Sequence, residues 1–542
     1  MTVADADRIA LRFQEEAVFG TTPGGDVTAT ITTTEATRTY SAAAGLDVFS
    51  VGQTILIAGL AQSASNGYKT VTSASATNLV VDEDIGTGEG PVASVTLKNA
   101  LNEVRLTGES LGQATAIQES QEIRDDRQVA DVRRTNRNAE GDISYEFSYG
   151  AFDKFLEAAL MASAWSTAVT ITTDTLSMAS GDNSINDAGG AYAHTASLAI
   201  TGNDTITRDA GSWVTDGFRD GMVITCSSSE DVGNDGDWTI TAISALVITI
   251  GAGGLTNNAA DTAMDIVNAG GFVTDGYAAD QWIRTSGFTT AANNDFYKIV
   301  SVAAGKMVLE GNTCVTEAAG DSVTVLMGEQ ITNGTTQHYY TLEREYTDVD
   351  EFALYTGMQV DTWTLDTNSD GIITGTFGWI GKDETSAAAT ESDGTAQSAA
   401  SNLVYSAIDD VDGILEALSD KSLKAFTISL ANNLRPRNVI GTLGPESIGV
   451  GRVTVTGTFQ KYFESEVLMD KYLNFTPTTL TMILDDNSGS GNAYVIDMPE
   501  VKFTNGRRVA GGTGQDIMAD MEWSAFRDSS EDVTIRIARF PE

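Results

Sequence analysis

Histidine, cysteine and proline are scarce in this sequence, and their scarcity excludes several classes of protein. The 542 residues include two His, two Cys and seven Pro. Cys226 and Cys314 cannot form a disulfide framework, and their apolar or small neighbours predict inert buried thiols. His194 and His338 have no nearby cysteine and no HxxxH spacing. This pattern predicts satisfied surface histidines and argues against a zinc site or a histidine-based triad.

Motifs for nucleotide binding and membrane insertion are also missing. The chain has no GxxxxGK[ST] and no GxGxxG after a strand. Its longest apolar stretch, AISALVITIGAGGL, is too short and too rich in glycine to span a bilayer. The N-terminus, MTVADADRIALRF, lacks a basic region followed by an apolar core. We therefore expect a soluble, cytoplasmic, non-enzymatic protein without a cofactor or metal.

Basic residues are few compared with acidic ones. The chain has 32 Lys and Arg against 75 Asp and Glu, a formal net charge of −43. Binding of nucleic acid through counterion release requires clustered Lys and Arg, so this composition predicts repulsion of DNA. Solubility alone and a halophile-type surface are alternative explanations of the same acidity.

A unit of one strand and one helix occurs twice. In GDISYEFSYGAFDKFLEAAL (141–160), alternation over Ile143–Tyr149 predicts a strand, and the apolar spacing predicts a helix over 152–160. GRVTVTGTFQKYFESEVLMDKYLN repeats the pattern from residue 451, an offset of 310, and predicts a helix at about 464–473. Farther along, GIITGTFGWIGKDET from residue 371 matches DIMADMEWSAFRDSS from residue 516, an offset of 145. The chain thus contains two tandem domains of one type.

Small repeated strand patterns interrupt the first of these domains. WVTDGF at 213–218 recurs as FVTDGY at 272–277, a shift of 59, and VGQTILIAG (51–59) with NGYKTVTSASATNLVV (66–81) forms a looser third copy. Repeats of this length are supersecondary modules, here all-β. The expected divisions are an N-terminal arm (1–22), an inserted module (23–97), the first tandem domain (98–165 plus 336–385), inserted modules (166–270 and 271–335), a linker (386–402) and the second tandem domain (403–542).

One turn sequence resembles the start of a calcium loop. DTNSDG, Asp366–Gly371, has alternating oxygen ligands, but Phe377 stands where an EF-hand needs its bidentate Glu. Asn, Asp and Gly are also favoured in turns between strands for conformational reasons. A calcium site here is therefore the alternative to a simple turn.

One segment departs from the general acidity. QEIRDDRQVADVRRTNR (121–137) is an exposed mixed-charge loop or hairpin in the simplest interpretation. In the functional interpretation it is an arm that pairs with acidic surface on another subunit, because Arg side chains suit interface carboxylates. DNA binding is a third interpretation, which the interleaved aspartates argue against. The candidate inter-subunit residues are Arg124, Asp125, Asp126, Arg127, Arg133, Arg134 and Arg137.

Several segments in order resemble one known family. They are LNEVRLTGESL (101–111), QEIRDDRQVADVRR (121–134), GDISYEFSYGAFDKFLEAAL (141–160), LYTGMQVDTWTL (354–365), NNLRPRNVIGTLGPESIGVGRVTVTGTFQKYFE (432–464), PEVKFTNGRRVAGGTGQD (499–516) and SAFRDSSEDVTIRI (524–537). Together they resemble the major tail tube protein of long-tailed, non-contractile phages. The resemblance covers about 98–165 and 336–542 and leaves out the inserted modules.

The resemblance implies a mainly β, β-rich α+β fold. Two tandem tail-tube-type β-sandwich or barrel domains, each with a packed α-helix, would carry the inserted small all-β modules. It implies a structural virion protein, assembled in the host cytoplasm, whose stacked rings form a tail tube that conducts DNA during ejection. Tape-measure, tail-tip and tail-terminator proteins are the implied partners. Two tube domains per chain predict a homotrimeric ring with pseudo-sixfold symmetry, with six chains per ring as the alternative.

Acidity then acquires a mechanism, since a carboxylate-lined channel repels the DNA backbone. Alternation places Asp142 and Glu146 opposite the aromatic face of their strand, so they are the candidates for the channel lining. Acidity confined to the outer modules is the alternative. Two other classes of protein compete with the tube: an extracellular β-repeat adhesin, and a calcium-dependent carbohydrate-active enzyme that would need paired catalytic carboxylates.

Overall fold

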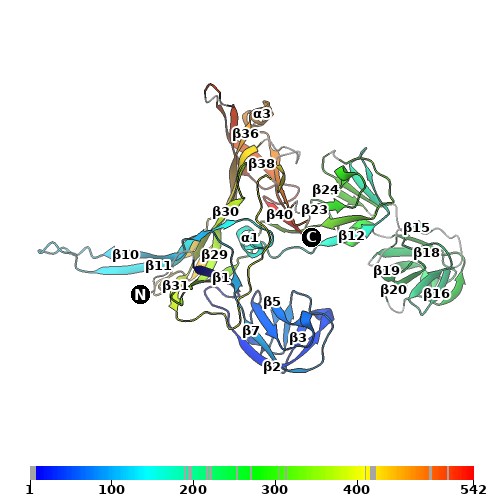
Figure 1. Cartoon of the computed structure of the whole chain (residues 1–542), viewed down its shortest axis with the longest axis horizontal. Helices are drawn as coiled ribbons and strands as arrows, with labels where there is room; N and C mark the ends of the chain where they lie inside the picture. Colours follow the sequence, from blue (N-terminus) through cyan, green and yellow to red (C-terminus); the bar gives the residue numbers. More distant parts are fainter. Residues whose placement is uncertain are drawn as a thin grey trace. The chain divides into compact units, whose positions relative to one another are not determined.

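The computed structural model describes residues 8–187, 191–192, 198–214, 218, 222–251, 254–268, 271–303, 305–311, 314–408, 410–414, 423–486, 491–509, 512–514 and 516–541. These residues form mostly β-strands, with three α-helices (Figure 1). They fall into two compact units, the first made by residues 1–164, 331–487 and 497–536, and the second by 165–330, 488–496 and 537–542. The expectation of a mainly β protein is confirmed.

Two copies of one order of strands and helix lie mostly in the first unit; residues 493–496 and 537–540, at the ends of two strands of the second copy, belong to the second unit. The first copy consists of β1 (Ile9–Glu16), β9 (Gly108–Glu109), β10 (Gly112–Glu119), β11 (Val132–Glu146), α1 (Asp153–Leu160), β28 (Tyr339–Tyr346), β29 (Glu351–Asn368), β30 (Thr374–Gly381) and β31 (Asp383–Ala387). The second consists of β32 (Val411–Ile414), β33 (Leu423–Ala431), β34 (Arg435–Arg437), β35 (Ser447–Gly449), β36 (Thr454–Tyr462), α3 (Val467–Leu473), β37 (Thr478–Asp485), β38 (Ala493–Val509), β39 (Met518–Ala525) and β40 (Arg536–Phe540).

Strand pairing gives the two copies the same internal geometry. β11 pairs with β30 so that Gly141 lies opposite Trp379, and β36 pairs with β39 so that Gly457 lies opposite Trp523. The copies therefore correspond at a shift of 316 residues on the first strand (457 against 141) and 144 on the second (523 against 379). In the second copy the absence of a side chain at Gly457 leaves room for the ring of Trp523, whereas at Gly141 it leaves room for the backbone of Ser110 and Leu111.

The third strand of each copy confirms this correspondence through a shared β-bulge. The register of β29 against β30 slips after Val360, and that of β38 against β39 slips after Phe503, a shift of 143 (503 against 360). The sequence match places the offsets at 310 and 145 instead. A slip of six residues, from 310 to 316, preserves period-two alternation, so the apolar pattern of a strand cannot detect it.

A helix follows the β11-type strand in both copies. α1 and α3 occupy the ranges predicted at 152–160 and about 464–473, within a few residues. The ring of Phe155 in α1 lies 4.9 Å from the ring of Trp379 and 5.5 Å from that of Phe377, edge on. α1 therefore packs on the aromatic face of the sheet. Across the described ranges, no helix is long and apolar enough to cross a membrane.

The N-terminal region contributes a strand and a small barrel. β1 pairs along its whole length with β28, from Ile9 opposite Tyr346 to Glu16 opposite Tyr339. Residues 9–16, expected in a separate arm, are therefore part of the first copy. The barrel is closed and follows β1; its strands are β2 (Asp26–Thr34), β3 (Thr39–Ser41), β4 (Thr54–Ala58), β5 (Gly67–Ala74), β6 (Asn78–Val81) and β7 (Val92–Asn99). Short β8 (Asn102–Glu103) lies between the barrel and β9.

The second unit holds two β-modules, one nested within the other. The seven-stranded sheet contains β12 (Val169–Thr173), β13 (Leu176–Ala179), β14 (Ser184–Asp187), β23 (Trp282–Ser286), β24 (Phe296–Ala303), β25 (Lys306–Leu309) and β26 (Val323–Met327). The eight-stranded sheet contains β15 (Ala191–Tyr192), β16 (Leu198–Thr201), β17 (Thr205–Arg208), β18 (Val223–Ser227), β19 (Gly236–Ile243), β20 (Val247–Ile250), β21 (Asn258–Asp261) and β22 (Asp265–Asn268). Helix α2 (Gly271–Asp275) lies between β22 and β23 in the sequence, and β27 (Glu329–Thr332) follows β26.

Nesting corrects the expected division into 166–270 and 271–335. β14 pairs with β25 and β12 with β26, so the strands before residue 188 belong to the sheet that resumes at β23. The 59-residue repeat survives this correction, because the bulge after Ile240 recurs after Ile299. A buried asparagine in a 3-10 turn also recurs at the same shift: Asn234 bonds Thr256, and Asn293 bonds Val315.

A glycine-to-alanine change tests the close approach of strands in the second copy. A methyl group at Gly457 would collide with the carbonyl oxygen of Thr427 and the ring of Trp523. We expect Gly457→Ala to lower the free energy of unfolding by about 1–3 kcal/mol, because the sheet interior must shift to accommodate it. Calorimetry would measure the change. At Gly371 the nearest heavy atom is 4.0 Å away, so an equal loss from Gly371→Ala would contradict the steric explanation.

Candidate assembly surface

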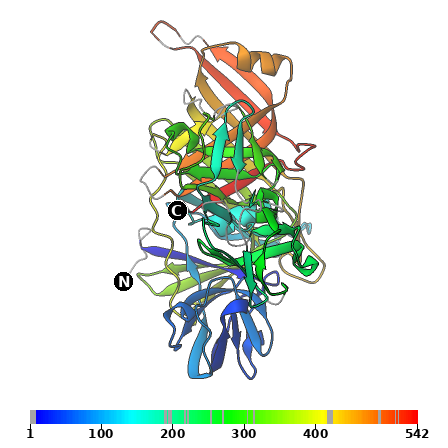
Figure 2. The ribbon, with the colours of Figure 1, turned by 90° about the vertical axis from the view of Figure 1, so that its right-hand side faces the viewer.

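One strand pair joins the two copies into a single sheet. β29 of the first copy pairs antiparallel with β33 of the second, from Thr362 opposite Ala431 to Asn368 opposite Ala425. With the pairings inside each copy, the order of strands is β10-β11-β30-β29-β33-β36-β39-β38. Figure 2 shows the strands of the second copy side by side in orange and red. Eight antiparallel strands thus form one continuous surface.

Large apolar side chains fill one face of this sheet. Tyr145, Trp363 and Phe377 are buried there under α1. The indole nitrogen of Trp363 donates a hydrogen bond to the hydroxyl oxygen of Tyr145 at 2.7 Å, and that hydroxyl donates to the carbonyl oxygen of Thr364 at 2.9 Å. Burial raises the pKa of Tyr145 far above its ordinary value, so the phenol stays a neutral donor.

The opposite face of the same strands, which we call the polar face, carries small and charged side chains. Its hydroxyl and amide residues include Ser144, Thr362, Thr364, Thr374, Thr376, Thr427, Ser429, Thr454, Thr456, Thr458, Gln460, Asn505 and Ser524. Its charged residues are Glu140, Asp142, Glu146, Asp366, Asp520 and Glu522, against Lys502 and Arg507. Carboxylates therefore outnumber cations on a face that has few large apolar groups.

Two predicted residues and one turn fall on or beside the polar face. Asp142 is exposed and Glu146 is half-buried on β11, both opposite Ile143 and Tyr145 in the alternation. Asp366 lies within β29 opposite Thr427, where burial raises its pKa. In the described part of the chain no three His, Cys, Asp or Glu side chains gather closely enough to hold a metal ion.

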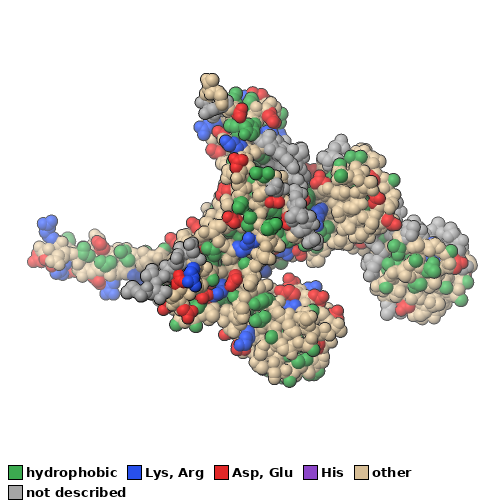
Figure 3. Space-filling model, in the orientation of Figure 1, with side chains coloured by type: hydrophobic (Ala, Val, Ile, Leu, Met, Phe, Trp, Pro, Cys, Tyr) green, Lys and Arg blue, Asp and Glu red, His purple; other side chains and the backbone are tan. Residues whose placement is uncertain are grey.

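The predicted arm is the hairpin of β10 and β11, which extends away from the sheet (Figure 1). Figure 3 shows charged side chains of both signs along it. Arg124 pairs with Asp126 at 2.8 Å, and Arg133 with Asp131 at 2.7 Å. Arg124 lowers the pKa of the exposed Asp126 carboxyl. The arm thus neutralises part of its own charge.

The remaining predicted arm residues lie at its tip and base. Arg127 has a left-handed backbone with φ 59° at the tip, next to the exposed Asp125 and Asp126. Arg134 lies opposite Ile117 on the partner strand. Arg137, at the base, forms an ion pair with Asp383. Apolar side chains missed by sequence reasoning stand among these charges: Ile117, Ile123, Val129 and Val132 are all more than half exposed.

His338 links α1 to the first strand, and the expectation of a surface position is wrong. Its side chain is buried, with Nδ1 2.8 Å from a Glu15 carboxylate oxygen and Nε2 2.7 Å from the carbonyl oxygen of Ala162. Both partners accept hydrogen bonds, so both ring nitrogens must carry protons. Burial alone would lower the pKa of His338, but the hydrogen bond it donates to Glu15 and the negative charge of Glu15 raise the pKa above the ordinary value. His194 lies outside the described residues.

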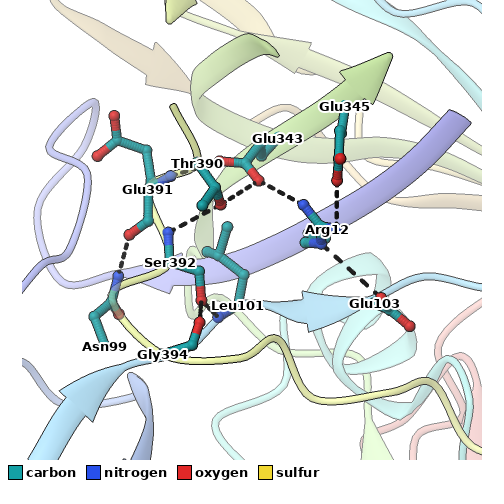
Figure 4. Close-up of polar contacts among 10 residues, drawn as sticks. All are labelled: Arg12, Asn99, Leu101, Glu103, Glu343, Glu345, Thr390, Glu391, Ser392 and Gly394. Carbon is teal, nitrogen blue, oxygen red and sulfur yellow. Dashed lines mark hydrogen bonds and ion pairs between the residues drawn. The ribbon is translucent and has the colours of Figure 1, made fainter. Parts of the chain in front are cut away.

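The segment predicted as the linker, residues 386–402, is anchored to the first copy (Figure 4). Glu343 of β28 is fully buried, and its carboxylate accepts hydrogen bonds from Arg12 at 3.1 Å, the Thr390 hydroxyl at 2.8 Å and the Glu391 backbone at 2.7 Å. A buried charge requires such partners. The connection between the copies is therefore fixed by specific contacts at its centre.

Both cysteines are buried in the second unit, Cys226 in the eight-stranded module and Cys314 in the seven-stranded one. Burial raises the pKa of Cys226 to about 12. At neutral pH this thiol stays protonated and is a poor nucleophile.

The geometry defines a mainly β protein with two tandem sheet-and-helix domains and inserted β-modules. Comparison with family models identifies its family: the model for the phage tail tube protein matches twice, over residues 6–316 and 309–525. The chain belongs to this family, as the sequence resemblance predicted, and the expected tandem tail-tube fold is confirmed. Comparison with curated proteins gives no match. The two matches overlap at 309–316, so β28–β31 fall within the second match. Strand pairing instead assigns these four strands to the first copy.

His338 predicts a pH dependence of stability with a defined sign. Because its pKa is raised on folding, its contribution is complete below about pH 6.5 and is lost as the pH rises through the folded-state value. We expect Tm to fall over that range in the native chain, and this slope to be reduced in His338→Gln. Thermal unfolding from pH 5.5 to 9 would measure both.

The facing groups allow a matched control. The pKa of Glu15 is lowered: burial opposes ionisation, but His338 and Lys154 outweigh it. Its contribution is therefore lost only as the pH falls, below the range of the experiment. Glu15→Gln should reduce the alkaline slope as His338→Gln does, because it removes the partner that holds the imidazolium. An unchanged slope in both variants would refute the assignment.

Proposed function

We propose that this chain polymerises into stacked rings whose central channel conducts phage DNA into the host during ejection. The observation that carries the proposal is the polar face: it runs without interruption across both copies and is rich in carboxylates and hydroxyls. Its opposite face is covered by apolar packing and by α1. A sheet with these two faces suits the wall of a water-filled channel, because DNA can pass along it without its phosphates binding to the wall.

The ring is proposed to contain three chains. Each chain supplies two equivalent domains, so three chains supply the six that a tube ring of this family commonly needs. The joined sheet supports this proposal, because the β29·β33 junction already places two domains edge to edge within one chain. Closure of the sheet around the ring would also remove its exposed edges.

Stacking of rings is proposed to use the connections at the ends of the β10-β11 and β34-β35 hairpins. Ile123 and Ile440 stand in these two connections, with 99% and 106% relative exposure. Fully exposed isoleucines in corresponding loops of both copies suit a contact with another ring, because an apolar group is otherwise disfavoured in water. Tape-measure, tail-tip and terminator proteins are the proposed partners at the tube ends, and the mature location is the virion tail.

Electron microscopy of the purified protein, with mass measurement on the same sample, tests the proposal directly. We expect rings or tubes roughly 100 Å wide, the scale of several packed domains around a channel. With a chain mass of 57.2 kDa, a ring of three weighs about 172 kDa (3 × 57.2) and a ring of six about 343 kDa (6 × 57.2). A chain that stays monomeric even with added tail-tip complex would refute the tube.

Reversal of charge on the polar face tests its role as the channel wall. Asp142→Lys with Glu522→Lys places two cations on exposed positions of that face. Assembled tubes of this variant should retain short duplex DNA at low salt and release it as salt rises, because the added cations displace counterions from phosphate. Cosedimentation of labelled DNA with tubes would measure retention.

The matched control changes the same number of charges elsewhere. Glu35→Lys with Asp47→Lys alters exposed positions on the N-terminal barrel. Tubes of this control should retain no more DNA than the native protein. Equal retention by both double variants would show that the polar face has no special access to DNA and would overturn its assignment as the channel wall.

A further inference from the structure

The joined sheet ends in two strand edges that no register among the described residues covers. At one end, β9 and β10 pair with β11 on one side. At the other, residues Val501–Val509 of β38 pair with β39 on one side. Exposed strand edges are templates for pairing with another chain. Each of these edges has an equivalent inside the chain that is paired.

The internal junction shows how such edges meet. β29 corresponds to β38, and β33 corresponds to the line of β9 and β10. The first correspondence is the shift of 143 given by the shared bulge. The second follows from the pairings with β11 and β36, in which Ala114 lies opposite Asn138 and Ala431 lies opposite Thr454. From β11 to β36 the shift is 316 (454 against 138), so from β10 to β33 it is 317 (431 against 114).

We propose that β38 of one chain pairs antiparallel with β9 and β10 of a second copy, in the register that β29 and β33 use within the chain. Thr362 opposite Ala431 becomes Asn505 opposite Ala114. The same two shifts place Arg507 opposite Gly112 and Val509 opposite Ser110. The pairs of Asn505 and Arg507 lie on the polar face, so the contact would continue that face from one chain to the next.

Apolar side chains beside the junction carry the same conclusion independently. Within the chain, Met161 at the end of α1 packs with Leu434 and Ile448, and all three are buried, at 4%, 8% and 3% exposure. The shifts that relate the copies map Leu434 to Ile117 and Ile448 to Val132. Met161 has a left-handed backbone just after its helix, with φ 51°, and Phe475 has the same conformation after α3, with φ 52°.

The mapped residues are exposed where their equivalents are buried. Ile117, Val132 and Phe475 have relative exposures of 65%, 51% and 57%. Ile117 and Val132 lie on the arm and Phe475 lies beside α3, so one chain cannot repeat the internal cluster at this end of the sheet by the same geometry. A second copy that supplies its arm would bury all three groups, and apolar burial is the main drive for association.

The internal junction has polar contacts that the proposed contact between chains would lack. The Asn432 side-chain amide donates to the carbonyl oxygens of Ala159 at 2.9 Å and Val360 at 3.1 Å, which ties the end of α1 to β29. The Leu434 backbone donates to the bulge residue Asp361 at 2.8 Å. At the proposed contact Thr115 and Thr504 replace Asn432 and Asp361, so this contact is less polar and depends more on the apolar cluster.

The occupant is a second copy of this chain, because the complementary edge belongs to the same molecule. The contact is heterologous: the β38 edge of one chain meets the β10 edge of the next, and such contacts repeat around a ring. This inference rests on the proposed function for the closure of the ring. It adds the two strands, their register and the apolar cluster that would hold them.

Disulfide cross-linking tests the register. The chain with Asn505→Cys and Ala114→Cys should form, under mild oxidation of assembled protein, covalent oligomers that end at the ring size. Directly opposite residues in an antiparallel pair have Cα atoms roughly 4.5–5.5 Å apart, which is within the Cα range of disulfides. The shifted pair, Asn505→Cys with Ala116→Cys, has the same face but the wrong register and should cross-link at least about tenfold less. Native Cys226 and Cys314 are buried and can stay.

The internal junction supplies the positive control. Thr362→Cys with Ala431→Cys occupies the equivalent pair within one chain and should close without forming oligomers. If tubes form and this control closes, but the predicted pair stays reduced or the shifted pair reacts better, the register is wrong while the tube stands. If the control closes and the chain neither assembles nor cross-links, both the interface and the proposed function are overturned.

A second variant tests the apolar cluster without cysteines. Ile117→Asp should raise the protein concentration needed for assembly by about tenfold or more, because it removes an apolar contact and buries a charge. Its side chain is exposed in the single chain, so the Tm of the unassembled protein should not change. Val232→Asp, at 81% exposure in the second unit, is the matched control. Equal assembly of Ile117→Asp and the control would refute the cluster.

Discussion

The β29·β33 pairing is the contact on which the rest of the structure depends. It joins two four-stranded sheets into one and aligns their polar and apolar faces, since a shift of one residue would exchange the two faces of a whole domain. Asn432, which follows β33, and Asp361, in the bulge of β29, hold that register. Asn432 donates to Ala159 at the end of α1 and to Val360, and the Asp361 carboxylate accepts from the Leu434 backbone. The duplication therefore does more than place two domains on one chain, because the chain also contains one complete contact between neighbouring domains.

A sheet with two different faces explains the distribution of chemistry in the first unit. Aromatic groups such as Trp363 and Phe377 collect under α1, where Tyr145 finds hydrogen-bond partners and remains neutral. Threonines and carboxylates occupy the other face, where β-branched polar residues suit strands exposed to water. Buried charged groups persist only with partners, as for Glu343 among Arg12 and Thr390, and His338 between Glu15 and Ala162. The buried charged groups therefore link segments that are distant in sequence.

The local residue pattern predicted the positions of strands and helices better than it predicted how the two copies align and which strands pair. Both helices and the alternation that sets the faces of Asp142 and Glu146 follow from period and spacing alone, but the strand predicted at Ile143–Tyr149 begins earlier, at Val132, and ends at Glu146. The offset of the duplication does not, because a period-two pattern is unchanged by a slip of six residues; only pairing, as of Gly141 with Trp379, fixes it. The nested modules were missed for a related reason. β14 and β25 are far apart in sequence, and nothing in either strand identifies its partner. His338 was misplaced because a single histidine carries no pattern, and its environment is made by Glu15 and Ala162, which are distant in sequence.

The position of the insertions gives a reason for keeping two copies on one chain. Both insertions occur in the first copy: the barrel lies between β1 and β9, and the second unit lies between α1 and β28. In the second copy α3 is followed by β37 after a short turn, so the sheet-and-helix domain is complete without a module at that place. The modules are therefore additions to a domain that closes on its own. In the proposed ring of three chains, only alternate domains would carry them. A tandem chain with insertions in one copy would therefore combine large appendages with a wall made of regularly repeated strands.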